Sequence, residues 1–381
     1  MRIVRRTALA VMALLVCAGQ PAVAETTHIT DVAGRVVEVE TPAKRLILGE
    51  GRQIYFVAAL DREAPFSHIV GWRDDLSKAD PESYAAYLER YPEIAKLPTF
   101  GGMKDGSFDV EQAVSLKPDV IVMNIDAKTA TEEAGYIETL AKVGIPLVYV
   151  DFREKPMLNT EPSMRIIGKL LGKETVAEDF IAFRKKSIEA VTDVLDEKKP
   201  ARPLVFVERA GGYSDDCCMS FGDENFGKMV EIAGGTNMAK DMIPGTFGSV
   251  NPEQIIASDP DQVIVTGGNW EGYVPGGAWV GVGYGADEAA ARVKLEALTK
   301  RPAFTGIKAV KTGEVHAIWH QFYNNPYQFV AIQEMAKWMH PDLFGDLDPE
   351  ATFKELHARF LPLPYKPGYF VSLTDKDGTA K

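Results

Sequence analysis

The sequence predicts an α/β protein made of two doubly wound, Rossmann-like lobes. Each lobe has a central, mostly parallel sheet, and one long α-helix joins them. Three observations predict this fold class. Short Val- and Ile-rich runs alternate with helical segments, which is typical of parallel sheets covered on both faces. The two halves share an internal repeat, and one long amphipathic segment separates them.

Residues 1–24 are expected to form a signal peptide that directs the protein to the periplasm. Three arginines precede an apolar run over 8–18, which is too short to span a bilayer, and Ala22–Ala24 is a small-residue cleavage site. The alternative is a lipoprotein anchored through Cys17. Val16 stands where a lipoprotein signal requires Gly, Ala or Ser, so we expect cleavage after Ala24 instead.

The remaining chain is acidic and has few cysteines. Residues 1–24 contain three arginines and no acidic residue, so removing them changes the net charge from −12 to −15. A surface of this kind argues against binding to nucleic acid or to anionic membranes. Only Cys217 and Cys218 remain, which excludes a disulfide scaffold, so a hydrophobic core must hold the fold.

The first lobe is predicted over 25–172, beginning with a small hairpin within 28–39. The strands that we expect are at 45–49, 68–72, 119–123 and 147–151, and the helices are at 53–60, 110–116 and 131–142.

The connecting helix is predicted within 173–200. Apolar residues recur every three to five positions between Glu174 and Lys199, which places a stripe along one side of a helix. Gly172 ends the preceding helix and Pro200 ends this one. The helix would be roughly 39 Å long and would join the lobes stiffly.

The second lobe is predicted over 201–373 and repeats the alternation. Its expected strands are at 204–208, 262–266 and 315–319, and its helices are at 224–233, 252–258, 326–339 and 349–360. Residues 374–381 are polar and are expected to be a disordered tail.

The internal repeat relates 109–122 to 251–264, at a constant offset of 142 residues. In each copy an Asp or Asn caps a short helix that begins near Glu-Gln, and Pro-Asp breaks the chain before a buried strand. Two copies on either side of a long helix predict twin lobes.

These features resemble the periplasmic substrate-binding proteins of ABC importers for iron chelates and cobalamin. The resemblance is carried by the paired Glu-x6-Pro-Asp motifs, the signal peptide, the long helix and the segments 226–237, 325–331 and 336–341. It covers almost all of the chain after residue 42. It implies a ligand cleft between the lobes, no enzymatic activity, no intrinsic cofactor, and an ABC permease in the inner membrane as partner. We expect a monomer.

The resemblance also implies a role for two glutamates. In this family a Glu on the outer surface of each lobe docks on permease arginines, and the matching positions are Glu111 and Glu253. The alternative is that both residues simply favour a helix N-terminus.

Four arginines follow predicted strand ends, where open parallel sheets bind their ligands. They are Arg52, Arg73, Arg153 and Arg209. Arginine pairs with carboxylate, catecholate or hydroxamate oxygens through two donors, so the set favours an anionic ferric complex. For each arginine alone, an ordinary surface salt bridge is the alternative.

Aromatic residues gather in the loops of the second lobe. A long, Gly-rich loop over 270–284 is expected to be a binding loop, and planar rings would pack on the organic part of a chelate. The candidate contacts are Tyr213, Trp270, Tyr273, Trp279, Trp319, His320 and Tyr323.

Two histidines, His316 and His320, are spaced H-x3-H. On a strand they would sit about 13 Å apart, too far to share one metal ion. His320 at the strand end, with Tyr323, is instead a candidate to complete iron coordination if the chelate leaves positions open. His316 is expected to be structural.

Cys217 and Cys218 are adjacent in the loop after the first strand of the second lobe. Neighbouring Cα atoms lie about 3.8 Å apart, closer than disulfides prefer. Export to an oxidising compartment nevertheless favours a vicinal bridge, which would present a rigid apolar face at the cleft rim. Two reduced thiols without a role are the alternative.

The sequence thus predicts a periplasmic binding protein for a ferric siderophore or a similar iron chelate. Cobalamin and haem are the alternative ligands, and cobalamin is nearly neutral, which suits the arginines less. An exported two-lobed α/β enzyme is the rival class. However, no G-x-G-x-x-G follows a strand, and there is no G-x-S-x-G elbow and no cysteine set for a cluster.

Overall fold

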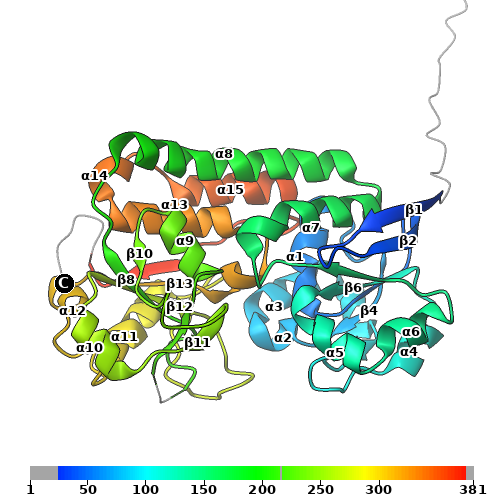
Figure 1. Ribbon diagram of the computed structural model, residues 1–381, viewed down its shortest axis with the longest axis horizontal. Helices are drawn as coiled ribbons and strands as arrows, with labels where there is room; N and C mark the ends of the chain where they lie inside the picture. Colours follow the sequence, from blue (N-terminus) through cyan, green and yellow to red (C-terminus); the bar gives the residue numbers. More distant parts are fainter. Residues whose placement is uncertain (1–24, 215–216, 375–381) are drawn as a thin grey trace, which may run out of the picture.

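The computed structural model of the protein describes residues 25–214 and 217–374. The predicted signal peptide, the lipid anchor at Cys17 and the tail beyond Thr374 lie outside these residues. Two α/β lobes lie side by side beneath the long helix α8 (Glu174–Lys198) (Figure 1). No helix in the described segments is both long and apolar enough to cross a bilayer.

The first lobe contains a five-stranded sheet in the order β5-β4-β3-β6-β7, and all neighbouring strands are parallel. Its strands are β3 (Leu46–Leu48), β4 (Ile69–Arg73), β5 (Thr99–Phe100), β6 (Val120–Asn124) and β7 (Leu147–Val150). The predicted hairpin is confirmed as the antiparallel pair β1 (Glu25–Thr30) and β2 (Val36–Thr41). In this lobe the strand order reverses between β3 and β6, which is where doubly wound sheets bind ligands.

The second lobe has the sheet order β10-β8-β12-β13-β14, in which only β14 runs antiparallel to its neighbour. Its strands are β8 (Leu204–Glu208), β10 (Thr236–Asn237), β12 (Gln262–Gly267), β13 (Val315–Trp319) and β14 (Phe370–Ser372). A small antiparallel pair, β9 (Met219–Phe221) with β11 (Phe247–Ser249), lies beside it. The two sheets confirm the predicted mostly parallel α/β class.

The helices cover these sheets and connect their strands. In the first lobe they are α1 (Ile54–Leu60), α2 (Leu76–Ala79), α3 (Pro81–Arg90), α4 (Val110–Ser115), α5 (Lys128–Glu133), α6 (Tyr136–Ala141) and α7 (Pro156–Leu171). After α8 they are α9 (Phe226–Ile232), α10 (Pro252–Ser258), α11 (Glu288–Leu298), α12 (Lys308–Thr312), α13 (Gln328–Met339), α14 (Pro341–Phe344) and α15 (Pro349–Phe360).

Several predicted boundaries were wrong for local reasons. The helix expected over 131–142 is broken into α5 and α6 by Gly135, whose φ of 65° is left-handed. The helix expected from 326 begins at Gln328, and Asn325 instead accepts a hydrogen bond from the Tyr327 backbone N–H at 2.8 Å. Strands β5, β9, β10, β11 and β14 were not predicted, because each has only two or three residues, too few to show an alternating pattern.

The internal repeat is confirmed in three dimensions. The side chain of Asp109 caps α4 by accepting from the Gln112 N–H, and Asn251 caps α10 by accepting from the Glu253 N–H. The aspartates after the repeated prolines correspond as well. Asp119 accepts from the backbone of Arg45 just before β3, at 3.0 Å, and Asp261 accepts from the backbone of Leu204 at the start of β8, at 2.7 Å. Each carboxylate therefore ties its strand to the neighbouring one.

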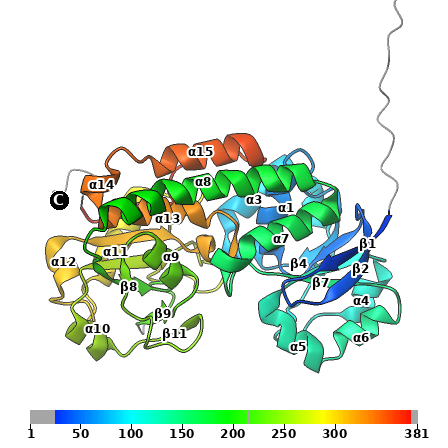
Figure 2. The ribbon, with the colours of Figure 1, turned by 45° about the horizontal axis from the view of Figure 1, so that its top comes forward.

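The lobes are joined by more than one helix. α13 and α15 of the second half pack beside α8, and α15 also reaches α1 of the first lobe (Figure 2). Phe183 of α8 contacts Phe329 and Phe360, with ring centroids 5.4 and 5.7 Å apart. One continuous apolar cluster consequently runs through residues of both lobes.

Candidate functional site

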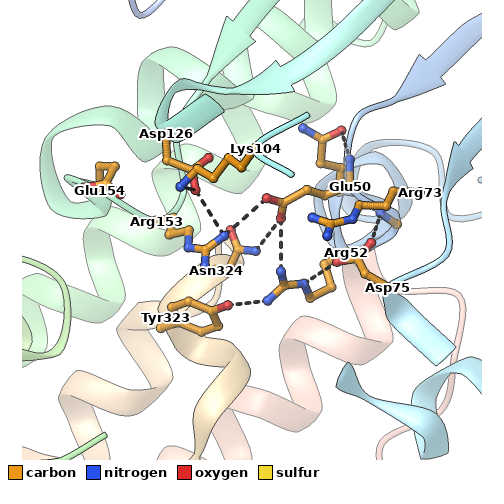
Figure 3. Close-up of polar contacts among 12 residues, drawn as sticks. Glu50, Arg52, Arg73, Asp75, Lys104, Asp126, Arg153, Glu154, Tyr323 and Asn324 are labelled. Carbon is orange, nitrogen blue, oxygen red and sulfur yellow. Dashed lines mark hydrogen bonds and ion pairs between the residues drawn. The ribbon is translucent and has the colours of Figure 1, made fainter. Parts of the chain in front are cut away.

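A polar cluster lies between the lobes, at the carboxyl ends of the strands (Figure 3). The first lobe contributes the loops after β3, β4, β6 and β7. The second lobe contributes the 3-10 turn His320–Asn324, which directly follows β13. This is the location that the topology of open parallel sheets selects for ligand binding.

Glu50 is the centre of the cluster and is 6% exposed. Its carboxylate lies 3.3 Å from the guanidinium of Arg52 and 3.2 Å from that of Arg153. It also accepts a hydrogen bond of 3.0 Å from the side-chain amide of Asn324, across the lobe boundary. Burial alone would raise the pKa of Glu50, but the two arginines and the amide outweigh it and lower the pKa to about 2. Glu50 is therefore ionised at neutral pH.

Arg52 links Glu50 to the second lobe. Its Nε lies 2.7 Å from the carboxylate of Asp75, and its terminal nitrogen donates to the hydroxyl of Tyr323. The guanidinium lies 5.6 Å from the centre of the Tyr323 ring, within the range of cation–π attraction. Each charge-bearing group of Arg52 thus has a partner.

Arg153 approaches Tyr323 from the other side. Its guanidinium lies 5.2 Å from the ring centre and 3.2 Å from the carboxylate of Asp126. Asp126 also pairs with Lys104 at 2.7 Å. The backbone carbonyls of Arg153 and Tyr323 both accept from the side-chain amide of Asn225, which holds the two lobes in register.

Arg209 differs from these two arginines in having no acidic partner among the described residues. Its guanidinium lies 5.0 Å over the ring of Phe247, which in turn contacts Tyr323 at 6.4 Å. Burial lowers the pKa of Arg209, and the positive charges of Arg153 and Arg52 lower it further. An anion placed here would relieve this repulsion.

His320 completes the site from the end of β13. Its Nδ1 lies 2.8 Å from the hydroxyl of Thr266, and its ring lies 4.3 Å from that of Tyr323. Burial and the charges of Arg209, Arg52 and Arg153 hold the pKa of His320 well below its ordinary value. The imidazole is therefore neutral at pH 7.

His316 faces a different environment, as the strand geometry predicts. It stacks on Trp338 at 4.4 Å, and its Nδ1 lies 2.7 Å from the Ser372 hydroxyl. Within the described ranges, no three or more His, Cys, Asp or Glu side chains are grouped so that they could hold a metal ion.

The predicted aromatic residues divide into two groups. Tyr213 contacts Trp270 at 5.5 Å and Tyr273 at 6.3 Å, and Trp270 contacts His320 at 5.5 Å. This group adjoins the polar cluster. Trp279 donates a hydrogen bond back to Val274 in its own loop.

Trp319 was expected beside the ligand, but the structure packs it into the core. It is 3% exposed and contacts Tyr55 and Tyr369 at 5.8 and 5.2 Å. Its ring therefore packs among rings of both lobes, and the arginines lie near the turn that follows β13 instead.

Arg73 and the cysteine pair lie at the margin of the site. Arg73 is 3.7 Å from Asp105, at the exposed edge of the first lobe.

Cys217 and Cys218 form a disulfide across a cis peptide bond. Cys218 is buried in the apolar cluster of the second lobe, with Cys217 half-buried beside it. The disulfide therefore packs against this core, and its contact with a ligand at the cleft rim stays a prediction.

Glu111 and Glu253 are both exposed, each in the first turn of its helix, α4 or α10. In Figure 1 these helices lie on the side of their lobes that faces away from α8. The two helices that carry these glutamates, one in each lobe, thus lie on the same side of the molecule.

Sequence reasoning missed the acidic half of the site. Glu50, Asp75 and Asp126 follow strand ends just as the arginines do, and Asn324 adjoins Tyr323. The sequence feature that could have identified them is a carboxylate within a few residues of an arginine, in the loops that follow the predicted strands. A search for anion-binding residues alone passes over them.

Comparisons with known proteins agree with this geometry. A family model described as "Periplasmic binding protein" matches residues 73–320. The crystal structure of the TroA-like periplasmic binding protein FepB from Veillonella parvula is 29% identical, with a TM-score of 0.81, and the match covers 91% of this chain and 99% of that one.

Two curated relatives extend the comparison. An uncharacterized ABC transporter substrate-binding lipoprotein of Bacillus subtilis, YvrC, is 24% identical over 68% of this chain and 73% of its own length. The molybdate-binding protein MolA of Haemophilus influenzae is 22% identical over 89% of this chain and 92% of its own.

Proposed function

Since the chain belongs to the periplasmic binding protein family, the non-enzymatic solute-binding components of ABC importers, we propose that its solute is an anionic ferric chelate, such as a ferric siderophore. One observation carries the proposal. Arg52 and Arg153 of the first lobe lie over Tyr323. Arg209 of the second lobe lies over the neighbouring Phe247 and has no carboxylate partner among the described residues. An anionic solute would supply that partner.

Binding would use groups from both lobes. The oxygen atoms of the chelate would accept from Arg209 and Arg153, whose Nε atoms have no hydrogen-bond partner among the described residues. The group formed by Tyr213, Trp270 and Tyr273 offers ring faces for the organic part of the ligand. The neutral imidazole of His320 and the hydroxyl of Tyr323 are the groups that would fill iron positions that the chelate leaves open.

A small oxyanion such as molybdate is the second candidate solute. Arg52 donates to Tyr323, and Asn324 donates to Glu50 at 3.0 Å, so side chains of the two lobes touch directly at the centre of the site. Lobes held this closely suit a small anion, whereas a large chelate requires these contacts to separate. The similarity to a molybdate-binding relative over most of both chains points the same way.

Titration calorimetry against a panel would decide between these solutes. The panel contains the ferric complexes of a hydroxamate, a catecholate and a citrate chelator, together with molybdate, haem and cobalamin. We expect 1:1 binding of a ferric complex and a parallel rise in melting temperature. Binding of molybdate alone would favour the second candidate, and binding of cobalamin alone would contradict an anionic solute.

We further propose the organisation that the sequence analysis predicts. A signal peptide would be cleaved after Ala24, and a monomer with lobes at 25–172 and 201–373 would deliver its solute to a permease in the inner membrane. Glu111 and Glu253 would contact basic residues of that permease, one from each lobe.

Charge reversal tests the docking role. The double variant Glu111→Lys, Glu253→Lys should leave the Kd of the solute unchanged but reduce solute-stimulated ATPase activity of the reconstituted transporter about tenfold or more, because two favourable ion pairs become repulsive. Glu174→Lys, an exposed change in the first turn of α8, is the matched control. Equal ATPase stimulation by both proteins would contradict docking through these glutamates.

A further inference from the structure

A second cavity lies within the second lobe, away from the interlobe cluster. Its volume is about 710 Å³, which is within the range of small-molecule binding sites. It is bounded by α11, α13, α15 and β14, and none of the residues of the interlobe cluster lines it. No role in the proposed solute binding accounts for this cavity.

The charged residues that line the cavity are mostly acidic. Five carboxylates line it, contributed by Glu288, Glu314, Glu334, Asp348 and Glu350. The two basic lining residues direct their donors to the backbone: Arg292 donates to the carbonyl of Ser372, and Lys337 donates to that of Leu347 at 2.6 Å. The cavity consequently carries a negative potential.

The pKa of Tyr365 is raised by the acidic residues around it, and its ring contacts a lysine of the chain. Burial raises its pKa, and the charges of Glu350, Glu288 and Glu334 raise it further. At the edge of the cavity the ammonium of Lys354 lies 5.5 Å over the Tyr365 ring and 2.8 Å from Glu350. The chain's own amine therefore already combines an aromatic face with a carboxylate here.

His316 lines the cavity together with the neighbouring Glu314. It is 2% exposed, and its Nδ1 lies 2.7 Å from the Ser372 hydroxyl. Its Nε2 is buried and has no hydrogen-bond partner in the described parts of the chain; the carboxylate of Glu314 lies 3.4 Å away. Because a carboxylate faces Nε2, the favoured tautomer carries its proton there, and the group that this pair offers to a cation is the carboxylate of Glu314.

From these observations we propose that the cavity binds a small organic polycation of the polyamine class. A single metal ion does not fit, because no three carboxylate or imidazole groups of the described residues converge on one point. The carboxylates are instead distributed over three helices and a strand end. An extended molecule with several ammonium groups can pair with more than one of these carboxylates at once, and its methylene chain can pack on Trp338 and Tyr365.

Titration with spermidine tests this proposal. We expect 1:1 binding to the full chain that weakens with added salt. The double variant Glu288→Gln, Glu350→Gln should weaken binding about tenfold or more, since two charge-assisted hydrogen bonds are lost. Glu288→Gln alone should weaken spermidine binding less than the double variant. Because Glu288 is exposed, this single change should not disturb folding, so it tests the proposal even if the double variant misfolds.

The matched control is Glu355→Gln, which lies on α15 together with Glu350. Glu355 is exposed and pairs with Arg359 at 2.8 Å, as Glu350 pairs with Lys354, but it does not line the cavity. Arg209→Ala should retain spermidine binding, which separates this site from the proposed solute site. No binding, equal weakening by Glu355→Gln, or binding only after removal of residues 375–381 would overturn the proposal.

Discussion

Arg209→Ala is expected to weaken solute binding about 100-fold, with little change in the stability of the protein. No carboxylate among the described residues pairs with Arg209, so its guanidinium is available to pair with an anionic ligand. Loss of a buried, charge-assisted contact costs about 2–3 kcal/mol, which corresponds to this factor. Calorimetry with the solute identified from the panel would measure it.

Two further variants show whether the charge or the geometry of Arg209 matters. Arg209→Lys keeps the charge but loses the two-pronged donor, so about a tenfold loss is expected. Arg165→Ala removes an arginine from an exposed pair with Glu178 and is the control, with no expected effect on binding. If Arg209→Ala binds as tightly as the unaltered protein, Arg209 does not contact the solute.

Glu50→Gln is expected to destabilise the protein by about 3 kcal/mol at pH 7. The substitution removes the carboxylate between Arg52 and Arg153 and leaves buried positive charge less well neutralised. The lowered pKa gives a figure of the same size: a change from 4.5 to about 2 corresponds to about 3 kcal/mol. Denaturant unfolding would measure the difference.

The pH dependence has a definite sign. The folded-state pKa of Glu50 lies below its unfolded value of 4.5, so its contribution is present above pH 4.5 and is lost as the pH falls towards 2. The stability difference between the unaltered protein and Glu50→Gln should therefore shrink over that interval. Glu178→Gln, in an exposed pair, is the control and should cost less than about 1 kcal/mol. A difference that does not vary with pH would contradict this assignment.

The sequence was sufficient for the architecture, because periodicity and the repeat are local properties. The buried strands β6 and β12 follow Pro-Asp in both halves, and the caps at Asp109 and Asn251 mark their helices directly. Strand order and the antiparallel β14 depend on tertiary packing, and the split at Gly135 depends on local backbone conformation. The spacing of apolar residues in one sequence predicts none of these.

The site was only partly predictable for a similar reason. Arg52, Arg153, Arg209, His320 and Tyr323 were selected by their place after strands, and the structure brings them together. What sequence position does not reveal is which charges are already neutralised. Glu50 and Asp75 occupy Arg52, whereas Trp319 packs against Tyr55 and Tyr369 in the core.

The shared apolar cluster has a consequence for the history of the chain. The repeat at an offset of 142 residues is what a duplicated unit leaves behind. Yet α1 and α7 of the first half are now covered by α8, and α1 also by α15. A fragment ending at Gly172 would expose the faces that these helices bury, and a fragment beginning after α8 would expose α13. We therefore expect the two halves to depend on each other for stability and to unfold together.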